Sequence, residues 1–156
     1  MEKRYWLIKS EPNDYSFDDL MAATNQTTHW DGVRNYQARN FMSKEMSPGD
    51  GVLFYHSNCK PPHVVGVATV ASEAYPDHTS WNEKSKYFDA KSTPDSPRWF
   101  MVDVQAVRKL ARVVPLQDLK DNPRLSEMKV IQRGQRLSVQ PVTLEEYNEV
   151  LQMSEA

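Results

Sequence analysis

Cysteine, glycine and long apolar runs are scarce in this chain, and each shortage excludes a class of structure or function. The one cysteine, Cys59, leaves no internal disulfide possible, as is usual in a reducing compartment. The five glycines form no G-x-x-x-x-G-K or G-x-G-x-x-G loop that could cradle phosphates. No apolar run approaches the about 18 residues of a membrane span, and the N-terminus lacks the apolar core of a signal peptide. We therefore expect a soluble, cytoplasmic protein with no membrane partner.

Positive charge is not in excess either. The chain carries 19 lysines and arginines against 21 acidic residues, for a formal net charge of −2. Proteins that bind nucleic acid through bulk electrostatics are usually basic. Any nucleic-acid interface in this chain must therefore combine a local basic patch with a specific pocket. The length of 156 residues and the hydrophobic content of 39% predict one ordinary globular domain over residues 1–156.

The hydrophobic pattern predicts both strands and helices. Apolar runs rich in β-branched residues predict strands over residues 5–9, 51–56, 64–70, 99–110 and 137–142. Ser16 is predicted to cap a short helix, residues 35–46 to form a second, and Thr143 with Glu146 to start a final helix with a capping box. Short helical turns are predicted at 115–120 and 125–131, and residues 74–98 form a long irregular segment. Strands that do not alternate regularly with helices indicate an α+β fold built around a curled sheet or small barrel.

Residues 30–40 concentrate the side chains that recognise nucleic acids. Aromatic rings stack on bases, amides match base edges, and arginine matches phosphate with two parallel contacts. Gly32 could let the backbone approach a flat ligand. The alternative is an ordinary loop that enters a helix with both aromatic rings in the core. The residues concerned are Trp30, Arg34, Asn35, Tyr36, Gln37, Arg39 and Asn40.

Two further clusters have a similar character. Residues 133–141 offer cations and amides beside an alternating strand, where a basic strand edge could meet a phosphate. Residues 54–58 lie at a strand end, where scaffolds often present ligand contacts. The alternatives are a solvated strand edge for the first cluster and a simple turn for the second.

Three sets of residues indicate an enzyme site as an alternative: a metal site, a cysteine nucleophile and a nuclease pattern. His56, Cys59 and His63 could ligate a metal, although a fourth ligand is not evident. Cys59 as a nucleophile would need a base within reach, and a small half-buried thiol is the alternative. Asp77, Asp89 and Lys91 match the acids and lysine of a metal-dependent nuclease, but they lie in the irregular segment rather than on adjacent strands.

Six short motifs, taken together, resemble a known family. They are residues 5–12 (YWLIKSEP), 30–40 (WDGVRNYQARN), 54–58 (FYHSN), 73–77 (EAYPD), 97–99 (PRW) and 136–142 (RLSVQPV). In this order they resemble the EVE domain, and most closely the thymocyte nuclear protein family and its bacterial relatives. The resemblance extends from about residue 5 to about residue 153. It implies a PUA-like fold, a small mixed β-barrel flanked by short helices.

The resemblance also implies a function and a set of site residues. It implies non-catalytic binding of nucleic acid, in which a modified cytosine in DNA or a modified RNA base enters an aromatic pocket, single-stranded or flipped from a duplex. The implied base pocket consists of Trp30, Asn35, Tyr36, Ser57, Asn58, Lys9, Ser10 and Glu11. The implied phosphate contacts are Arg34, Arg39 and Arg136, with Arg98, Trp99 and Gln140 as further candidates. Neither a cofactor nor a metal is expected. A metal-dependent enzyme acting on nucleic acid and a small-molecule or protein-binding module remain the alternatives.

Overall fold

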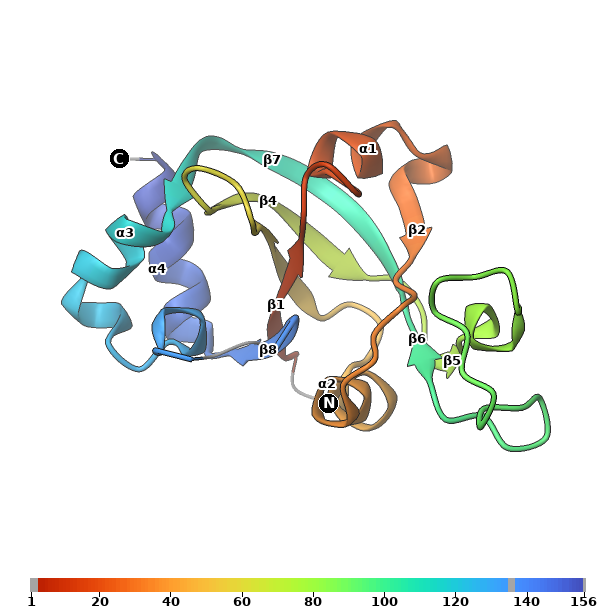
Figure 1. The fold of residues 1–156 in the computed structure, drawn as a ribbon. Coiled ribbons are helices and arrows are strands. Elements are labelled where there is room, and N and C mark those ends of the chain that lie inside the picture. The colour runs from red at the N-terminus through yellow and green to blue at the C-terminus, as the bar shows by residue number, and fades with distance from the viewer. Residues whose placement is uncertain (1–2, 135–136, 156) are drawn as a thin grey trace.

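The computed structural model describes residues 3–134 and 137–155, and its main feature is a curled six-stranded sheet (Figure 1). The strand order is β2-β7-β4-β3-β1-β8. Only the neighbours β1 and β3 run parallel, and the other pairs are antiparallel. The strands are β1 (Tyr5–Ser10), β2 (Thr27–His29), β3 (Gly51–His56), β4 (His63–Val70), β7 (Asp103–Pro115) and β8 (Val139–Val142). The predicted α+β fold around a curled sheet is confirmed.

The two parallel strands, β1 and β3, are buried on both faces, which explains their uninterrupted apolar sequences. Along β1, Trp6 and Ile8 point into one core cluster and Leu7 points into the other. Along β3, Phe54 points into the cluster of Trp6 and Leu53 points into the cluster of Leu7. Successive side chains of a strand point to opposite faces, so a strand covered on both sides needs apolar residues at every position. The sheet therefore has a core on each side.

The helices cover the two faces at opposite ends of the sheet. Helices α1 (Phe17–Ala22) and α2 (Tyr36–Asn40), followed by the π-helical turn η2 (Phe41–Glu45), supply apolar residues to the Trp6 cluster. Helices α3 (Leu116–Asp121) and α4 (Leu144–Glu155) pack with the Leu7 cluster beside the C-terminus (Figure 1). The short 3-10 turns are η1 (Thr24–Gln26), η4 (Pro123–Leu125) and η5 (Lys129–Ile131). None of the helices in residues 3–134 and 137–155 combines the length and apolar character that crossing a bilayer requires.

Local capping signals in the sequence are realised in the structure. The Ser16 hydroxyl accepts the Asp19 N–H at 3.0 Å, and the Asp19 carboxylate accepts the Ser16 N–H at 2.9 Å. Thr143 and Glu146 form the same reciprocal pair at the start of α4. Such capping bonds satisfy N–H groups that the first turn of a helix leaves free. The predictions for both helix starts are confirmed.

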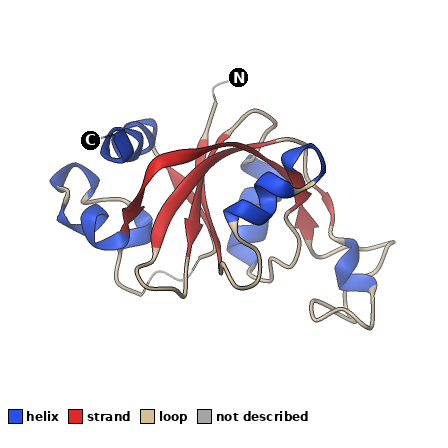
Figure 2. Ribbon diagram, turned by 90° about the horizontal axis from the view of Figure 1, so that it is seen from above, coloured by secondary structure: helices blue, strands red, loops and turns tan. Residues whose placement is uncertain are grey.

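The long irregular segment forms a separate lobe at one end of the sheet (Figures 1 and 2). Its base is the two-stranded pair β5 (Tyr75–Pro76) and β6 (Phe100–Met101), and it contains the 3-10 turn η3 (His78–Trp81). Buried polar bonds organise it, because the Ser80 hydroxyl donates to the Asp77 carbonyl at 2.8 Å. Periodic apolar residues are few here, which explains why the sequence predicts only an irregular segment.

Three boundaries differ from the prediction. Strand β2 was not predicted, because its three polar residues carry no alternating pattern. The predicted helix over residues 35–46 divides into α2 and the π-helical η2. The predicted strand over residues 99–110 divides into β6 and β7, and β7 continues to Pro115 because it pairs with the whole length of β4.

Candidate nucleic-acid site

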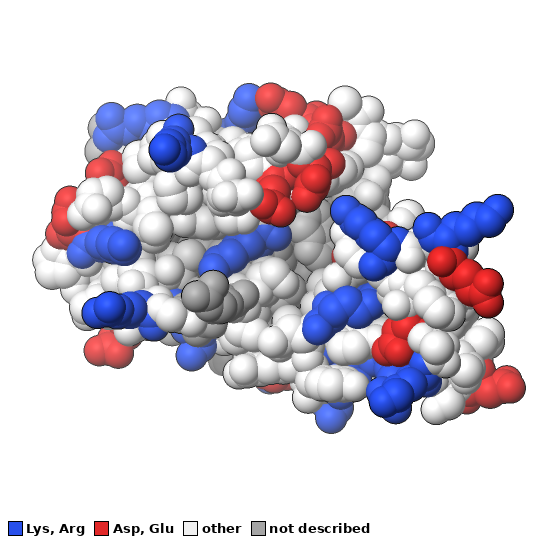
Figure 3. Space-filling view, viewed as in Figure 1, with Lys and Arg blue, Asp and Glu red and all other residues white. Residues whose placement is uncertain are grey.

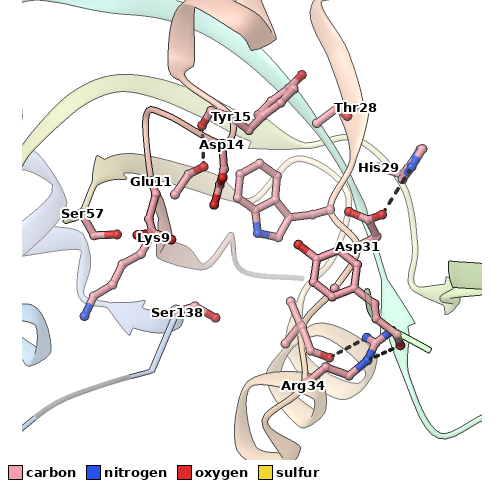
Figure 4. Close-up of a pocket in the computed structure, with 15 residues that line it drawn as sticks. Lys9, Glu11, Asp14, Tyr15, Thr28, His29, Asp31, Arg34, Ser57 and Ser138 are labelled. Carbon is pink, nitrogen blue, oxygen red and sulfur yellow. Dashed lines mark hydrogen bonds and ion pairs between the residues drawn. The ribbon is translucent and has the colours of Figure 1, made fainter. Parts of the chain in front are cut away.

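A cavity of about 440 Å³ opens where the parallel strands β1 and β3 end (Figure 4). Its walls come from the end of β1 and the loop behind it, from β2 and the loop that follows, from Ser57 after β3, and from Ser138 before β8. Tyr87 reaches it from the lobe. The lining residues are Lys9, Ser10, Glu11, Asp14, Tyr15, Thr28, His29, Trp30, Asp31, Gly32, Val33, Arg34, Ser57, Tyr87 and Ser138. Six predicted site residues therefore lie around one cavity: Lys9, Ser10, Glu11, Trp30, Arg34 and Ser57.

Trp30 is half-buried and belongs both to the cavity and to the core. Its backbone N–H donates to the Val102 carbonyl at 2.8 Å, which anchors the loop to the sheet. Its indole packs edge-to-face on Phe54, with ring centroids 5.5 Å apart, and on Tyr15 at 6.2 Å. Such edge contacts hold the orientation of a ring. Trp30 therefore packs on the core and lines the cavity at once, and its stacking on a base stays a prediction.

Tyr87 supplies a second aromatic wall that the sequence did not reveal. Its ring packs against the backbone of Gly32, whose φ is +77°, and a Cβ at Gly32 would lie 2.5 Å from the ring. Only glycine permits this combination of left-handed backbone and close approach. The flat group against Gly32 is thus the protein's own tyrosine. The one available signal in the sequence was that the otherwise irregular segment contains several aromatic residues, Tyr75, Trp81, Tyr87 and Phe88.

Arg34 and Asp77 tie the Tyr87 wall to the cavity loop. The Arg34 guanidinium donates to the Tyr87 carbonyl at 2.7 Å and to the Asp77 carboxylate at 3.1 Å. Asp77 is fully buried and also accepts the Gly32 N–H at 2.8 Å. Burial raises the pKa of Asp77, but hydrogen bonds from Thr79, Gly32 and Arg34 outweigh it and hold this pKa below its ordinary value. The carboxylate is therefore ionised and pairs with Arg34, whose proposed phosphate contact stays a prediction.

The cavity is lined by groups of both charges. Figure 4 shows Lys9, Ser57 and Ser138 on one side and Asp31 and Arg34 on the other. Lys9 has no side-chain hydrogen bond or ion pair to any residue that the structure describes, and burial lowers the pKa of its ammonium. The cavity therefore holds an ammonium without an ion pair among the described residues on one side, and both a carboxylate and a guanidinium on the other.

Acidic residues form the upper rim of the cavity. Figure 3 shows them above the central groove, with lysines and arginines on either side. The segment between β1 and α1 contributes the exposed Glu11 and Asp14, both of which line the cavity. The Glu11 carboxylate accepts a hydrogen bond from the Asn58 amide, which orients it. The cavity therefore presents hydrogen-bond acceptors on a rim that repels phosphate.

Four predicted residues form a separate surface, which we call the arginine ledge: Tyr36, Arg39, Arg98 and Trp99. None of them lines the cavity. The exposed Tyr36 ring stacks on the buried Trp99 ring, with centroids 4.9 Å apart and planes 22° apart. Arg39 lies over the Tyr36 ring at 4.7 Å, and Arg98 donates to the Tyr36 hydroxyl at 3.3 Å. The structure therefore separates these residues from Trp30.

Residues 4–153 match the EVE domain family. This chain belongs to that family. It is 45% identical over 168 residues to thymocyte nuclear protein 1 of Gallus gallus, covering 97% of this chain and 69% of the relative. The resemblance inferred from the six motifs is thereby confirmed.

Solved structures resemble this EVE domain closely. The human THYN1 protein, solved in complex with DNA containing 5-methylcytosine, superposes with a TM-score of 0.92 at 44% identity and covers 99% of both chains. A protein from Pseudomonas putida superposes with a TM-score of 0.91 at 45% identity, covering 96% of this chain and 99% of the other. A YTH domain of Zygosaccharomyces rouxii in complex with N6-methyladenosine RNA, at 17% identity and a TM-score of 0.55, shares the fold.

The remaining predicted residues of this EVE domain have structural contacts outside the cavity. The Asn35 side chain accepts the Ala38 N–H at 3.0 Å and so caps α2. The buried Gln140 amide donates to the Leu137 carbonyl at 2.8 Å. Asn58, exposed and with φ of +54°, contacts the cavity only through Glu11. Arg136 lies outside the described residues.

The two histidines considered for a metal site are joined by a series of hydrogen bonds in this EVE domain, and the Cys59 thiol donates to the His56 and Pro61 carbonyls. The Phe17 N–H donates to His56 Nε2 at 3.1 Å, so His56 Nδ1 carries the proton that faces His63 Nε2, also at 3.1 Å. His63 Nδ1 then donates to the Pro61 carbonyl at 2.7 Å. Every ring nitrogen is thus used with both histidines neutral. Residues 3–134 and 137–155 contain no group of three or more potential metal ligands.

Proposed function

We propose that this EVE domain binds nucleic acid by holding one modified base between Trp30 and Tyr87, and that a modified cytosine is the preferred base. Both rings line a cavity of about 440 Å³, within the range of about 300–1,000 Å³ that ligand pockets occupy. Aromatic rings bind bases through stacking worth roughly 1–3 kcal/mol per base. The human THYN1 protein, 44% identical over nearly the whole chain, has been solved with DNA containing 5-methylcytosine.

The polar lining favours a base with an exocyclic amino group. Glu11, Asp14 and Asp31 line the cavity and can accept hydrogen bonds from such a group. Cytosine presents an amino donor at the position where thymine presents an acceptor. The hydroxyl of Ser57 can donate to the base's own acceptors. We therefore expect preference for modified cytosine over thymine, although both carry a substituent at the same ring position.

The methyl group itself is expected to contribute modestly. Burying one methyl-sized group is worth about 0.8 kcal/mol, or roughly a fourfold change in affinity. Larger discrimination would require a clash with the unmodified or wrong base rather than burial alone. The acidic rim and the net charge of −2 oppose binding through bulk electrostatics. Extracting a base from a stack costs a few kcal/mol, so single-stranded or already unpaired sites should bind more tightly than intact duplex.

Non-catalytic binding is part of this proposal. The acids of the nuclease pattern already accept hydrogen bonds within the fold, because Asp77 pairs with Arg34 and Asp89 accepts the Trp99 indole N–H at 2.7 Å. Incubating labelled oligonucleotides with the protein and magnesium or manganese should yield no cleaved or deaminated product. Turnover that is lost in Asp77→Ala or Asp89→Ala while the fold persists would overturn this part.

The central test replaces each aromatic wall. Trp30→Ala and Tyr87→Ala should each weaken binding of a 5-methylcytosine oligonucleotide by roughly 5- to 150-fold, the equivalent of 1–3 kcal/mol of stacking. Phe88→Ala is the matched control, since Phe88 is an exposed aromatic of the same lobe that does not line the cavity. Fluorescence anisotropy measures binding, and circular dichroism verifies the fold of each variant. Equal affinity of the wild type for methylated, plain and thymine-containing oligonucleotides would refute base reading.

A further inference from the structure

The arginine ledge brings two positive charges together, and among the described residues no carboxylate forms an ion pair with either, since Asp89 attracts Arg98 only from a greater distance. Arg39 and Arg98 both contact Tyr36, and Arg39 Nη1 donates to the Arg98 carbonyl at 3.0 Å. The other Arg39 bonds go to the Asn40 side-chain carbonyl, at 3.1 and 2.9 Å. All of these acceptors are neutral.

Among the described residues, some arginines form ion pairs and others, such as Arg108 and Arg112, do not, but the ledge is where two guanidinium groups without an ion pair contact one ring. Arg4, Arg34 and Arg124 each form an ion pair with a carboxylate. Within the described residues neither arginine of the ledge has one. Two adjacent guanidinium groups repel each other, and an anion placed between them would remove that repulsion. Guanidinium groups match phosphate oxygens with paired, charge-assisted hydrogen bonds.

The ledge is rigid and continuous with the cavity. Trp99 is buried, and its indole N–H is fixed by Asp89, so the Tyr36 ring rests on a firm support. The Arg34 guanidinium lies over the Trp99 ring at 5.2 Å and over the Tyr87 ring at 5.5 Å. Arg34 also lines the cavity. One side chain therefore joins the ledge to the wall of the base site, while the acidic rim lies on the segment between β1 and α1.

We propose that the arginine ledge binds a phosphodiester of the nucleic-acid strand whose base occupies the cavity. This inference rests on the proposed function and adds the path of the backbone. The acidic rim directs phosphates away from the β1–α1 side, and the ledge receives them beside the lobe. Arg39 and Arg98 supply the charge, and Tyr36 is the spacer that holds the two guanidinium groups on one surface.

The test separates phosphate binding from base binding by changing the ligand. Arg39→Gln and Arg98→Gln are each expected to weaken binding of a single-stranded 5-methylcytosine oligonucleotide about fivefold at low salt. Each should also reduce the slope of log affinity against log salt by about 0.7 for every phosphate that the variant no longer neutralises. The free 5-methylcytosine nucleoside, which has no phosphate, should bind every variant as it binds the wild type.

Two further variants distinguish charge from fold. Lys120→Gln, in the exposed last turn of α3 at the opposite end of the molecule (Figure 1), removes the same charge and should leave the salt slope unchanged. Arg98→Lys retains the charge but not the paired geometry, and it should recover most of the salt slope with only part of the affinity. Circular dichroism and urea denaturation accompany each variant.

Different results overturn the two proposals separately. An unchanged salt slope in the Arg39→Gln, Arg98→Gln double variant would refute the phosphodiester site even if base reading stands. Equal loss of nucleoside and oligonucleotide binding would refute it too, because the arginines would then act only by supporting the fold. A wild type that binds all oligonucleotides equally, but with a salt slope that depends on these arginines, would refute base reading and retain the ledge.

Discussion

Replacing Gly32 with alanine is expected to weaken base binding as well as to strain the fold. The Cβ of alanine would lie 2.5 Å from the Tyr87 ring, whereas carbon atoms in contact are normally about 3.5–4.0 Å apart. The ring must therefore retreat by about 1 Å. Its backbone cannot follow freely, because Arg34 holds the Tyr87 carbonyl at 2.7 Å. The ring therefore tilts, and the wall that Tyr87 gives the cavity changes its shape.

The expected magnitudes differ for stability and binding. A left-handed alanine at φ +77° costs roughly 1–2 kcal/mol of unfolding free energy. The clash itself adds little to that cost, because the atom that Cβ would meet is at the far end of a side chain that can rotate. Binding should fall by roughly 5- to 150-fold if the stacking contribution of Tyr87 is lost. Anisotropy titration with a 5-methylcytosine oligonucleotide and urea denaturation measure the two effects.

Gly49 offers a matched control within the same chain. It also has a left-handed backbone, with φ of +96°, but a Cβ there would meet nothing within 4 Å. Gly49→Ala should therefore destabilise the fold through backbone strain and leave base binding unchanged. The reasoning fails if Gly32→Ala binds as the wild type does, or if Gly49→Ala loses binding to the same extent.

Three other predictions concern the buried polar groups. Asp50→Ala should lower the unfolding free energy by about 3 kcal/mol in urea denaturation. The substitution leaves the buried Trp6 indole N–H and the backbone N–H groups of Arg4 and Ser47 without their acceptor. A loss below about 1 kcal/mol would contradict this. Burial, followed by repulsion from His63 when that ring is protonated, holds the pKa of His56 below its ordinary value near 6.5. The unfolded chain therefore takes up the proton first as the pH falls. Stability should be lost as the pH falls from above 6.5 through the lower folded pKa. Urea midpoints at about pH 7.5 and pH 5.5 should show this loss, and an equal loss in His56→Gln would count against it. Arg34→Gln should weaken oligonucleotide binding by releasing the Tyr87 carbonyl while leaving the salt slope unchanged, and a reduced slope would instead assign Arg34 to a phosphate.

The chain's local signals were sufficient for most of the fold. Strand β1 alternates Trp6, Leu7 and Ile8 between two cores, and that doubly buried character is visible as an unbroken apolar run. The capping residues Ser16 and Thr143 act within one helical turn, so their partners lie three residues away in the sequence. The motifs around Trp30 and at the ends of β1 and β3 also identified the family and six residues of the cavity.

Only the tertiary structure decided which aromatic rings share the cavity. Tyr36 is close to Trp30 in the sequence, yet α2 turns it onto Trp99 and away from the cavity. Tyr87 is distant in the sequence, yet the buried Asp77 and its bonds to Gly32 and Arg34 bring it to the same cavity as Trp30. The physical reason is that hydrophobic periodicity and caps report contacts within a few residues. A site closed by hydrogen bonds between a loop and a remote lobe has no such period, so its geometry appears only when the chain is folded.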